Sequence, residues 1–187
     1  MDKSDRKKLQ QYITEKYTGL RLRDVRLYVG SYKVPFENKQ GWHLCDVAVE
    51  FEFDEDSIFT FCFDPEWELL DFFDKSYVEM VPETQTKMFR QSQHGLWQPF
   101  VGNTLENIDI HWNWYQDFDE NTYYIPQVIK FEFVDDKKFI VAGVNVGVDK
   151  GDIVLNLDSE GDIIVGFTEE IWSIITDEIL RQDQHNK

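Results

Sequence analysis

One stretch of this chain carries the residue types of an acid–base site. Asp109, His111 and Tyr115 lie at odd positions of a segment whose even positions, from Ile108 to Trp114, are apolar. Alternate side chains of a β-strand point to one side, so Asp109 and His111 could share a proton beside the Tyr115 hydroxyl. An antiparallel strand with one face in solvent has the same pattern. No Ser or Cys nucleophile motif accompanies it, so we favour a solvated strand face, with a small hydrolase-like enzyme as the alternative.

The candidate metal ligands are scattered along the chain. Histidine occurs at positions 43, 94, 111 and 185 and cysteine at 45 and 62, with no HxxxH, HExxH or CxxC spacing. Metal sites that can be recognised from sequence show such spacings. The acidic segment 158–162 lacks the alternating ligands and the distal Glu of a calcium loop. The sequence therefore predicts no metal site and no cofactor.

Carboxylates gather in turn-like segments between the predicted strands, where a charge stays in water and costs little desolvation. Trp42 lies on a strand face shared with polar residues, where a partner could reach its ring. We expect these residues to contact a protein partner of cationic character. The predicted binding residues are Asp54, Glu55, Asp56, Asp117, Asp119, Glu120 and Trp42.

Charge is divided unevenly along the sequence. Residues 1–40 carry 10 Lys and Arg against 5 Asp and Glu, whereas the remainder carries 9 against 31, and the whole chain has a net charge of −17. Contacts to phosphates need clustered Lys and Arg, so general nucleic-acid binding is not expected. Three arginines gather on an early strand, and acidic side chains from elsewhere in the chain could neutralise them.

The bulk composition is that of a folded protein. With 187 residues, 42% of them hydrophobic, and 15 Phe, 8 Tyr and 6 Trp, the chain can bury a sizeable core. We expect a single domain over residues 1–187. The sequence shows no secretory leader pattern, no apolar run of membrane-spanning length and no disulfide framework. These features predict a cytoplasmic protein.

Periodicity predicts the elements of the first half. An apolar stripe at helical spacing indicates a helix from Ser4 to Tyr17, and a period-two strand with a bulge at Arg23-Asp24 follows. A hairpin then pairs Phe51 with Phe59 and Val49 with Phe61. This register sets Cys62 opposite Ala48 and keeps Cys45 and Cys62 on different faces. A short helix is predicted after Asp64, running through Trp67, Leu70 and Phe73.

The second half is more regular after an aperiodic connection. In residues 74–105 we expect a concealed helix around 83–91, with Trp97 and Phe100 fixing the segment to the core. Hairpins are predicted for 129–133 with 139–141 and for 153–157 with 163–167, before a final helix capped by Thr168. The predicted fold class is α+β, with an antiparallel-rich sheet of about eight strands and helices at both termini.

Aromatic residues and glycines mark six segments of the C-terminal half: Trp97–Gly102, Ile108–Trp112, Tyr124–Pro126, Ile129–Phe133, Gly151-Asp152 and Ile163–Phe167. This pattern resembles that of small acidic bacterial proteins of unknown function. Some of those proteins are of the immunity type and neutralise toxins of polymorphic or contact-dependent systems. The resemblance implies a non-catalytic binding protein and assigns no functional residue.

Overall fold

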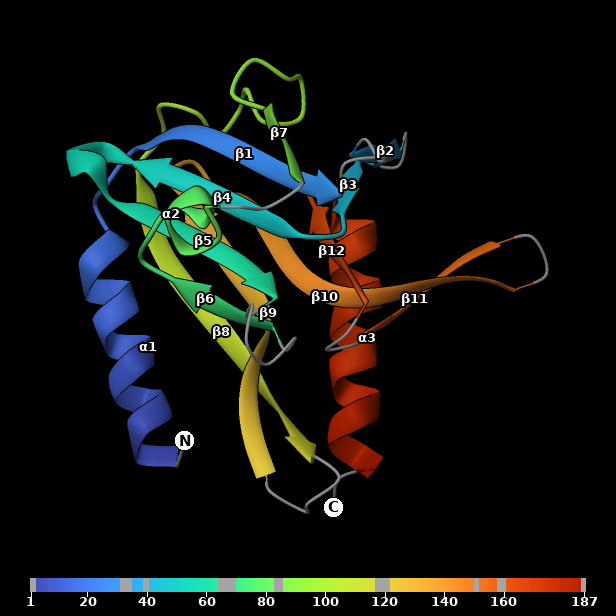
Figure 1. The fold of residues 1–187 in the computed structure, drawn as a ribbon. Coiled ribbons are helices and arrows are strands. Elements are labelled where there is room, and N and C mark those ends of the chain that lie inside the picture. Colours follow the sequence, from blue (N-terminus) through green and yellow to red (C-terminus); the bar gives the residue numbers. More distant parts are fainter. Residues whose placement is uncertain are drawn as a thin grey trace.

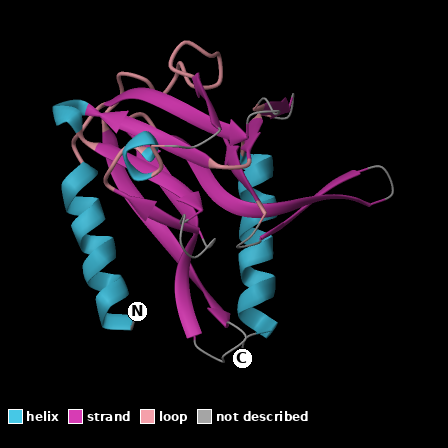
Figure 2. Ribbon diagram, in the orientation of Figure 1, coloured by secondary structure: helices cyan, strands magenta, loops and turns pink. Residues whose placement is uncertain are grey.

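A computed structural model shows an α+β fold with helices near both ends of the chain and antiparallel sheets between them (Figures 1 and 2). The structure describes residues 3–30, 35–38, 41–63, 70–82, 86–116, 122–149, 152–157 and 161–185. The helices are α1 (Lys3–Tyr17), α2 (Tyr77–Met80) and α3 (Glu169–His185), and η1 (Asp54–Asp56) is a 3-10 turn. The strands are β1 (Leu22–Gly30), β2 (Phe36–Asn38), β3 (Trp42–Cys45), β4 (Ala48–Phe53), β5 (Ile58–Phe63), β6 (Leu70–Phe73), β7 (Thr86–Arg90), β8 (Leu105–Gln116), β9 (Thr122–Phe133), β10 (Lys137–Asp149), β11 (Asp152–Leu157) and β12 (Asp162–Gly166).

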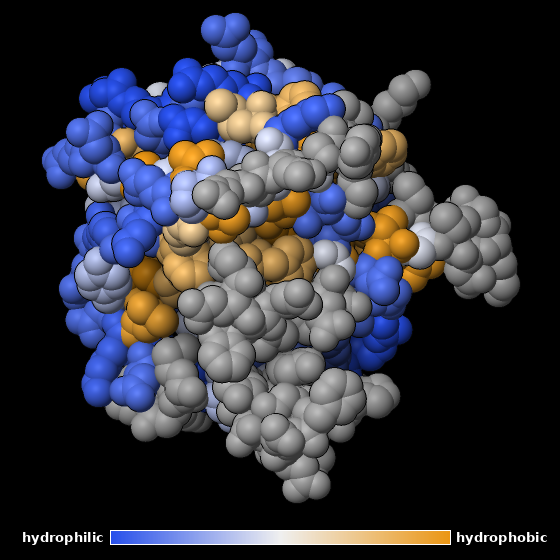
Figure 3. Space-filling view, viewed as in Figure 1, coloured by the Kyte–Doolittle hydropathy of each residue, from blue (hydrophilic) through white to orange (hydrophobic). Residues whose placement is uncertain are grey.

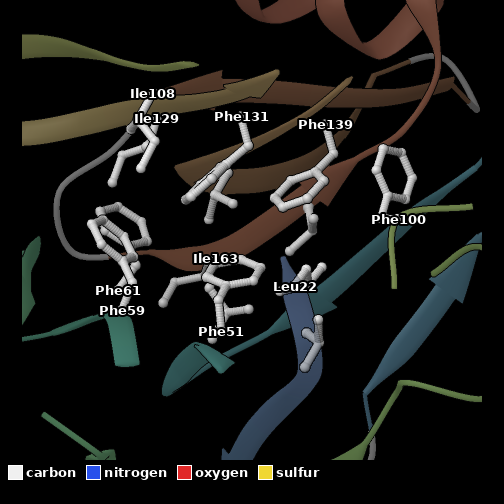
Figure 4. Close-up of a cluster of buried hydrophobic side chains, with 14 of the residues drawn as sticks. Leu22, Phe51, Phe59, Phe61, Phe100, Ile108, Ile129, Phe131, Phe139 and Ile163 are labelled. Atoms are coloured by element: carbon white, nitrogen blue, oxygen red, sulfur yellow. The ribbon is translucent and has the colours of Figure 1, made fainter. Parts of the chain in front are cut away.

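The strands form two sheets that share one aromatic core. The five-stranded sheet has the order β6-β5-β4-β1-β7, and the seven-stranded sheet has the order β2-β3-β12-β10-β9-β8 with β11 added to β10. Phe51 and Phe59 from the first sheet contact Phe131 of the second, with ring centroids 4.9 and 5.5 Å away, and Phe139 stacks beside it (Figure 4). Alternating apolar residues therefore supply the inner faces of both sheets.

The helices cover surfaces that the sheets leave open. α3 packs Ile171, Ile175 and Ile179 on the outer face of the seven-stranded sheet. α1 lies along β8, where the Gln10 side chain donates to the Ile108 carbonyl and accepts from the Ile110 amide. This pairing protects the edge of the sheet. Among the described residues, no helix is both long and apolar enough to cross a membrane.

Three predictions for the first half are confirmed: the hairpin register, the bulge and the separation of the two cysteines. β4 and β5 pair Phe51 with Phe59 and Ala48 with Cys62, as expected. The register of β1 against β4 shifts between Leu22 and Asp24, where the sequence predicted a bulge. The two cysteines form no disulfide and are buried in different clusters of the core. Short turns and strict alternation fix such registers locally.

Two predicted helices are wrong. Residues 70–73, expected to continue a helix begun after Asp64, form strand β6 at the edge of the five-stranded sheet, while 64–69 lie outside the described residues. Thr86–Arg90, expected to be helical, form strand β7 against β1. Both segments are short, and each gains backbone hydrogen bonds from an unpaired sheet edge. With them the described residues hold twelve strands, more than the predicted number of about eight.

The third predicted hairpin is also wrong, because β11 and β12 do not pair with each other. Both pair with β10, one after the other: Val144 lies opposite Leu157 of β11 and opposite Asp162 of β12. β10 has thirteen residues, enough to bond both strands along its length. The two strands thus follow one another along β10, and Gly161 stands between them.

Candidate functional site

The polar face of β8 is engaged in structural contacts. Asp109 is exposed and His111 is half-buried on this strand. The Asn113 amide, which lies between the predicted catalytic positions, donates to Gln127 at 2.8 Å and to Gln182 of α3 at 3.1 Å. Tyr115 belongs to the strand, but its side chain is outside the described residues. This face therefore attaches α3 to the sheet.

The predicted acidic tip at η1 is only partly available to a partner. Asp54 accepts hydrogen bonds from Arg21, at 2.9 Å, and from Arg23. The hydrogen bond from Arg21, followed by that from Arg23, holds the pKa of Asp54 below its ordinary value. Glu55 and Asp56 are exposed, make no ion pair with a described residue, and have positive φ angles of 60° and 55°. The free charge of this tip is therefore carried by two residues.

Of the other predicted binding residues, the structure describes only Trp42. Trp42 is 1% exposed and packs in the cluster beneath α3, so its ring cannot contact a partner in this fold, and the prediction for it is wrong. Its strand, β3, pairs with β12 along one edge and with β2 along the other, and the sequence did not reveal these neighbours. Asp117, Asp119 and Glu120 lie outside the described residues.

An apolar groove lies between α1 and the β5–β6 edge, beside the η1 tip. It has a volume of about 250 Å³, and Figure 3 shows apolar residues gathered next to the hydrophilic surface of α1. Tyr12 is 50% exposed at the groove, so its ring is accessible to a partner. The groove is lined by Leu9, Tyr12, Ile13, Tyr17, Phe59, Asp71, Phe72, Phe73 and Asp74.

Asp74, at the rim of the groove, bonds to two side chains of α1. Lys16 Nζ lies 2.8 Å from Asp74 Oδ2, and the Tyr12 hydroxyl donates to the same oxygen at 3.4 Å. The Lys16 hydrogen bond holds the pKa of Asp74 below its ordinary value, so this carboxylate is ionised at neutral pH. The groove therefore combines aromatic surface with the Lys16–Asp74 ion pair and the Asp71 carboxylate, and it can suit a side chain with an apolar stem and a cationic end that competes with Lys16 for Asp74.

A buried carboxylate lies on the outer face of the five-stranded sheet. Glu50 is 0% exposed, forms an ion pair with Arg26, and accepts from the Tyr28 hydroxyl at 3.2 Å, from Ser76 Oγ at 2.9 Å and from the Tyr77 amide at 2.8 Å. Burial and the Glu50 carboxylate raise the pKa of Tyr28 to about 12. With every oxygen bonded, Glu50 holds the start of α2 against the sheet.

A third group of polar side chains brings together Glu37, His43 and His94. One donor atom from each residue lies within 4.8 Å of the others, and His94 Nε2 is 3.0 Å from Glu37 Oε2. His43 is 2% exposed, and its ring meets that of His94 edge-on with centroids 5.0 Å apart. Burial, together with His94, lowers the pKa of His43 to about 4, so its imidazole is neutral at pH 7.

The fold explains why these three residues meet. Glu37 of β2 is the direct cross-strand partner of His43 of β3, so their side chains leave the sheet on the same face. His94 comes from the turn that follows β7, whose position is fixed by the buried Trp97. Sequence reasoning missed the group because β2 is only three residues long and His94 is distant in sequence. The alternation around His43 was its one visible sign.

Comparison with known proteins does not place the chain in a family. No protein-family model, no curated protein and no solved structure matches it. Its function must therefore be argued from its own residues.

Proposed function

We propose that this chain is a non-catalytic binding protein that holds a basic protein partner against the groove between α1 and β6. The observation that supports the proposal is the groove itself, in which Tyr12 and Phe72 offer apolar surface beside the carboxylates Asp71 and Asp74. Aromatic residues in a pocket are the usual anchors of protein interfaces. Glu55 and Asp56 are exposed on η1, whose flanking residues Phe53 and Ile58 contact Tyr17 of the groove.

The charge of the chain supports a cationic partner. The three arginines in and next to β1 are bound by the protein's own carboxylates: Arg21 and Arg23 by Asp54, and Arg26 by Glu50 and Glu52. They are thus already occupied, and the net charge of −17 dominates at long range. This charge repels nucleic acid.

We further propose that the partner is a toxin and that the chain neutralises it in the cytoplasm as an immunity-type inhibitor. The resemblance to immunity-type proteins supports this narrower proposal, and so do the two buried cysteines, which form no disulfide and suit a reducing compartment. The hydrolase-like alternative rests on Asp109 and His111. It is less favoured because the adjacent Asn113 amide is taken up by Gln127 and Gln182.

The test uses a basic protein encoded next to this gene. We expect it to bind the purified chain, and Tyr12→Ala combined with Asp74→Asn to weaken the affinity at least about tenfold, because an exposed anchor and its carboxylate are lost. Trp114→Ala, which removes another large aromatic that is 43% exposed, is the matched control and should change little.

Two results would oppose the proposal. Equal affinities of the groove variant and the wild-type chain would show that the partner binds elsewhere. A turnover reaction of the isolated chain that is lost on His111→Ala would favour the enzyme, whereas a binding protein should keep its affinity in that variant.

A further inference from the structure

Three side chains of metal-ligand type converge on one side of the seven-stranded sheet, away from the residues of the groove. Glu37 and His43 face each other across β2 and β3, and His94 reaches them from the turn after β7. Two imidazoles and one carboxylate form a common donor set for zinc and for other divalent transition metals. A ligand set built by strand pairing and a distant turn needs no sequence motif.

His43 supplies an independent reason to expect a ligand. Neither of its ring nitrogens has a hydrogen-bond partner among the described residues, although His43 is only 2% exposed. Buried polar atoms of this kind are rare because they lose their bonds to water without replacement. The ring is held by Trp97 and Phe167, at centroid distances of 6.1 and 5.8 Å, and by His94.

We propose that Glu37, His43 and His94 bind one divalent transition-metal ion of the zinc class. Zinc takes nitrogen and carboxylate oxygen at about 2.0–2.2 Å, which sets neighbouring donors about 3.3 Å apart in a tetrahedral site. The His94–Glu37 pair, at 3.0 Å, already has nearly this spacing. Magnesium and calcium prefer all-oxygen sites, so the two imidazoles select against them.

The group can close around an ion with small movements. The donor atoms lie within 4.8 Å of one another, and rotations of Glu37 and His94, both partly exposed, shorten the longer separations. Metal binding at His94 Nε2 places the ring proton on Nδ1 and ends a contact from the Leu96 amide. That contact is 3.5 Å long, at the outer limit of hydrogen bonding, so its loss costs little.

The site would differ from a closed structural zinc site. Three protein ligands leave a fourth position for water or for a group of another molecule, and the exposed sides of His94 and Glu37 give an ion access from solvent. The ion would also tie the β2–β3 edge to the segment around Trp97. The competing interpretation, an aromatic cluster beside a surface His–Glu pair, leaves both nitrogens of His43 without a partner among the described residues.

The experiment titrates chelator-treated protein with Co²⁺ and Zn²⁺. We expect one Co²⁺ per chain with the visible d–d bands of low coordination number, displacement by Zn²⁺, and no displacement by about a 100-fold excess of Mg²⁺. His94→Ala and Glu37→Gln, which change partly exposed side chains, should each weaken binding at least about tenfold. His111→Ala removes a histidine of β8 and is the control.

Calorimetry with Zn²⁺ and a thermal melt of each variant complete the test. Wild-type and His111→Ala chains should melt at a higher temperature with Zn²⁺, and the His94 and Glu37 variants should lose that rise while keeping their metal-free melting temperature. Weak binding of many ions that Mg²⁺ displaces would show that surface carboxylates alone take up metal, and would overturn the proposal. Equal Co²⁺ affinity in the His94→Ala and wild-type chains would also overturn it.

Discussion

Glu50 is the residue whose environment departs most from that of an exposed strand carboxylate. It is fully buried, yet Arg26, Tyr28, Ser76 and the Tyr77 amide bond both of its oxygens. Alternation along β4 places it on the face away from the aromatic core, where the α2 segment covers it. The charge is tolerated because both oxygens that burial removes from water gain hydrogen-bond donors.

Removing this carboxylate should be costly. Glu50→Ala removes the main partner of the half-buried Arg26, which keeps Glu52, and it leaves the Tyr28 and Ser76 hydroxyls without this acceptor. We expect a loss of about 3–5 kcal/mol in the free energy of unfolding. Glu55→Ala, at the exposed η1 tip, should stay within about 0.5 kcal/mol. Urea denaturation of both variants measures this difference. A cost for Glu50→Ala no larger than that for Glu55→Ala would show that the network does not hold α2.

The two thiols should be inert in the folded chain. Cys45 donates to the Ala48 carbonyl at 3.4 Å, burial raises the pKa of its thiol, and Cys62 lies in a separate cluster with Tyr28 and Tyr77. Because the thiolate is the reacting form, a water-soluble thiol reagent should label neither cysteine in native buffer and both in denaturant. Rapid labelling of one cysteine in native buffer would indicate that the residues packed over it open and expose the thiol.

At the level of elements, β10 organises the seven-stranded sheet. It pairs with β9 over residues 137–142, with β12 over residues 140–144 and with β11 over residues 144–149. The chain between β11 and β12 passes close to β10, and a Cβ added to Gly161 would overlap the carbonyl oxygen of Val144. Glycine is required there by close backbone approach.

Because of this close approach, we expect alanine to destabilise the chain more at Gly161 than at Gly147. Gly161→Ala should reduce the free energy of unfolding by about 1–3 kcal/mol, because the backbone of β10 or β12 must move. Gly147→Ala is a control on the same long strand, where the nearest atom to an added Cβ is 4.0 Å away. Thermal melts of the two variants should differ clearly; similar melting temperatures would argue against continuous pairing of β11 and β12 with β10.

The sequence could predict elements wherever the evidence is local. The register of Phe51 with Phe59 follows from one alternating pattern and one tight turn, and the helix ended by Gly19 follows from its stripe. The prediction of the third hairpin was wrong because a turn-like acidic segment can join either the two strands of a hairpin or two strands that both pair with a third strand. The predictions for the β6 and β7 segments were wrong because short edge strands are stabilised by neighbouring strands that the local sequence does not show.

The same limit applies to the candidate sites. The stripe of α1 predicted a packed helix, but the groove needs β6, so Tyr12 could not be recognised as part of it. Glu37 and His43 are strand partners six residues apart, whereas His94 joins them only through the packing of Trp97. Of the predicted acidic tip, Glu55 and Asp56 are exposed, whereas Asp54 is bound by two arginines.

On the scale of the whole molecule, charge and shape act together in the proposed function. The −17 net charge should attract a basic partner at long range, and the groove should hold it at contact. α3 lies on the opposite side of the molecule from α1 and η1 in Figure 1. Carboxylates near η1 should therefore affect the association rate more than carboxylates on α3.

The most direct measurement is the association rate constant of a basic partner as a function of salt. We expect the rate to fall by about tenfold or more from low to physiological ionic strength, with a much smaller change in dissociation. Glu55→Asn with Asp56→Asn, which keeps residues tolerant of positive φ, should lower the low-salt rate more than Glu170→Gln with Asp177→Asn on α3. An association rate indifferent to salt and to both double variants would contradict the account.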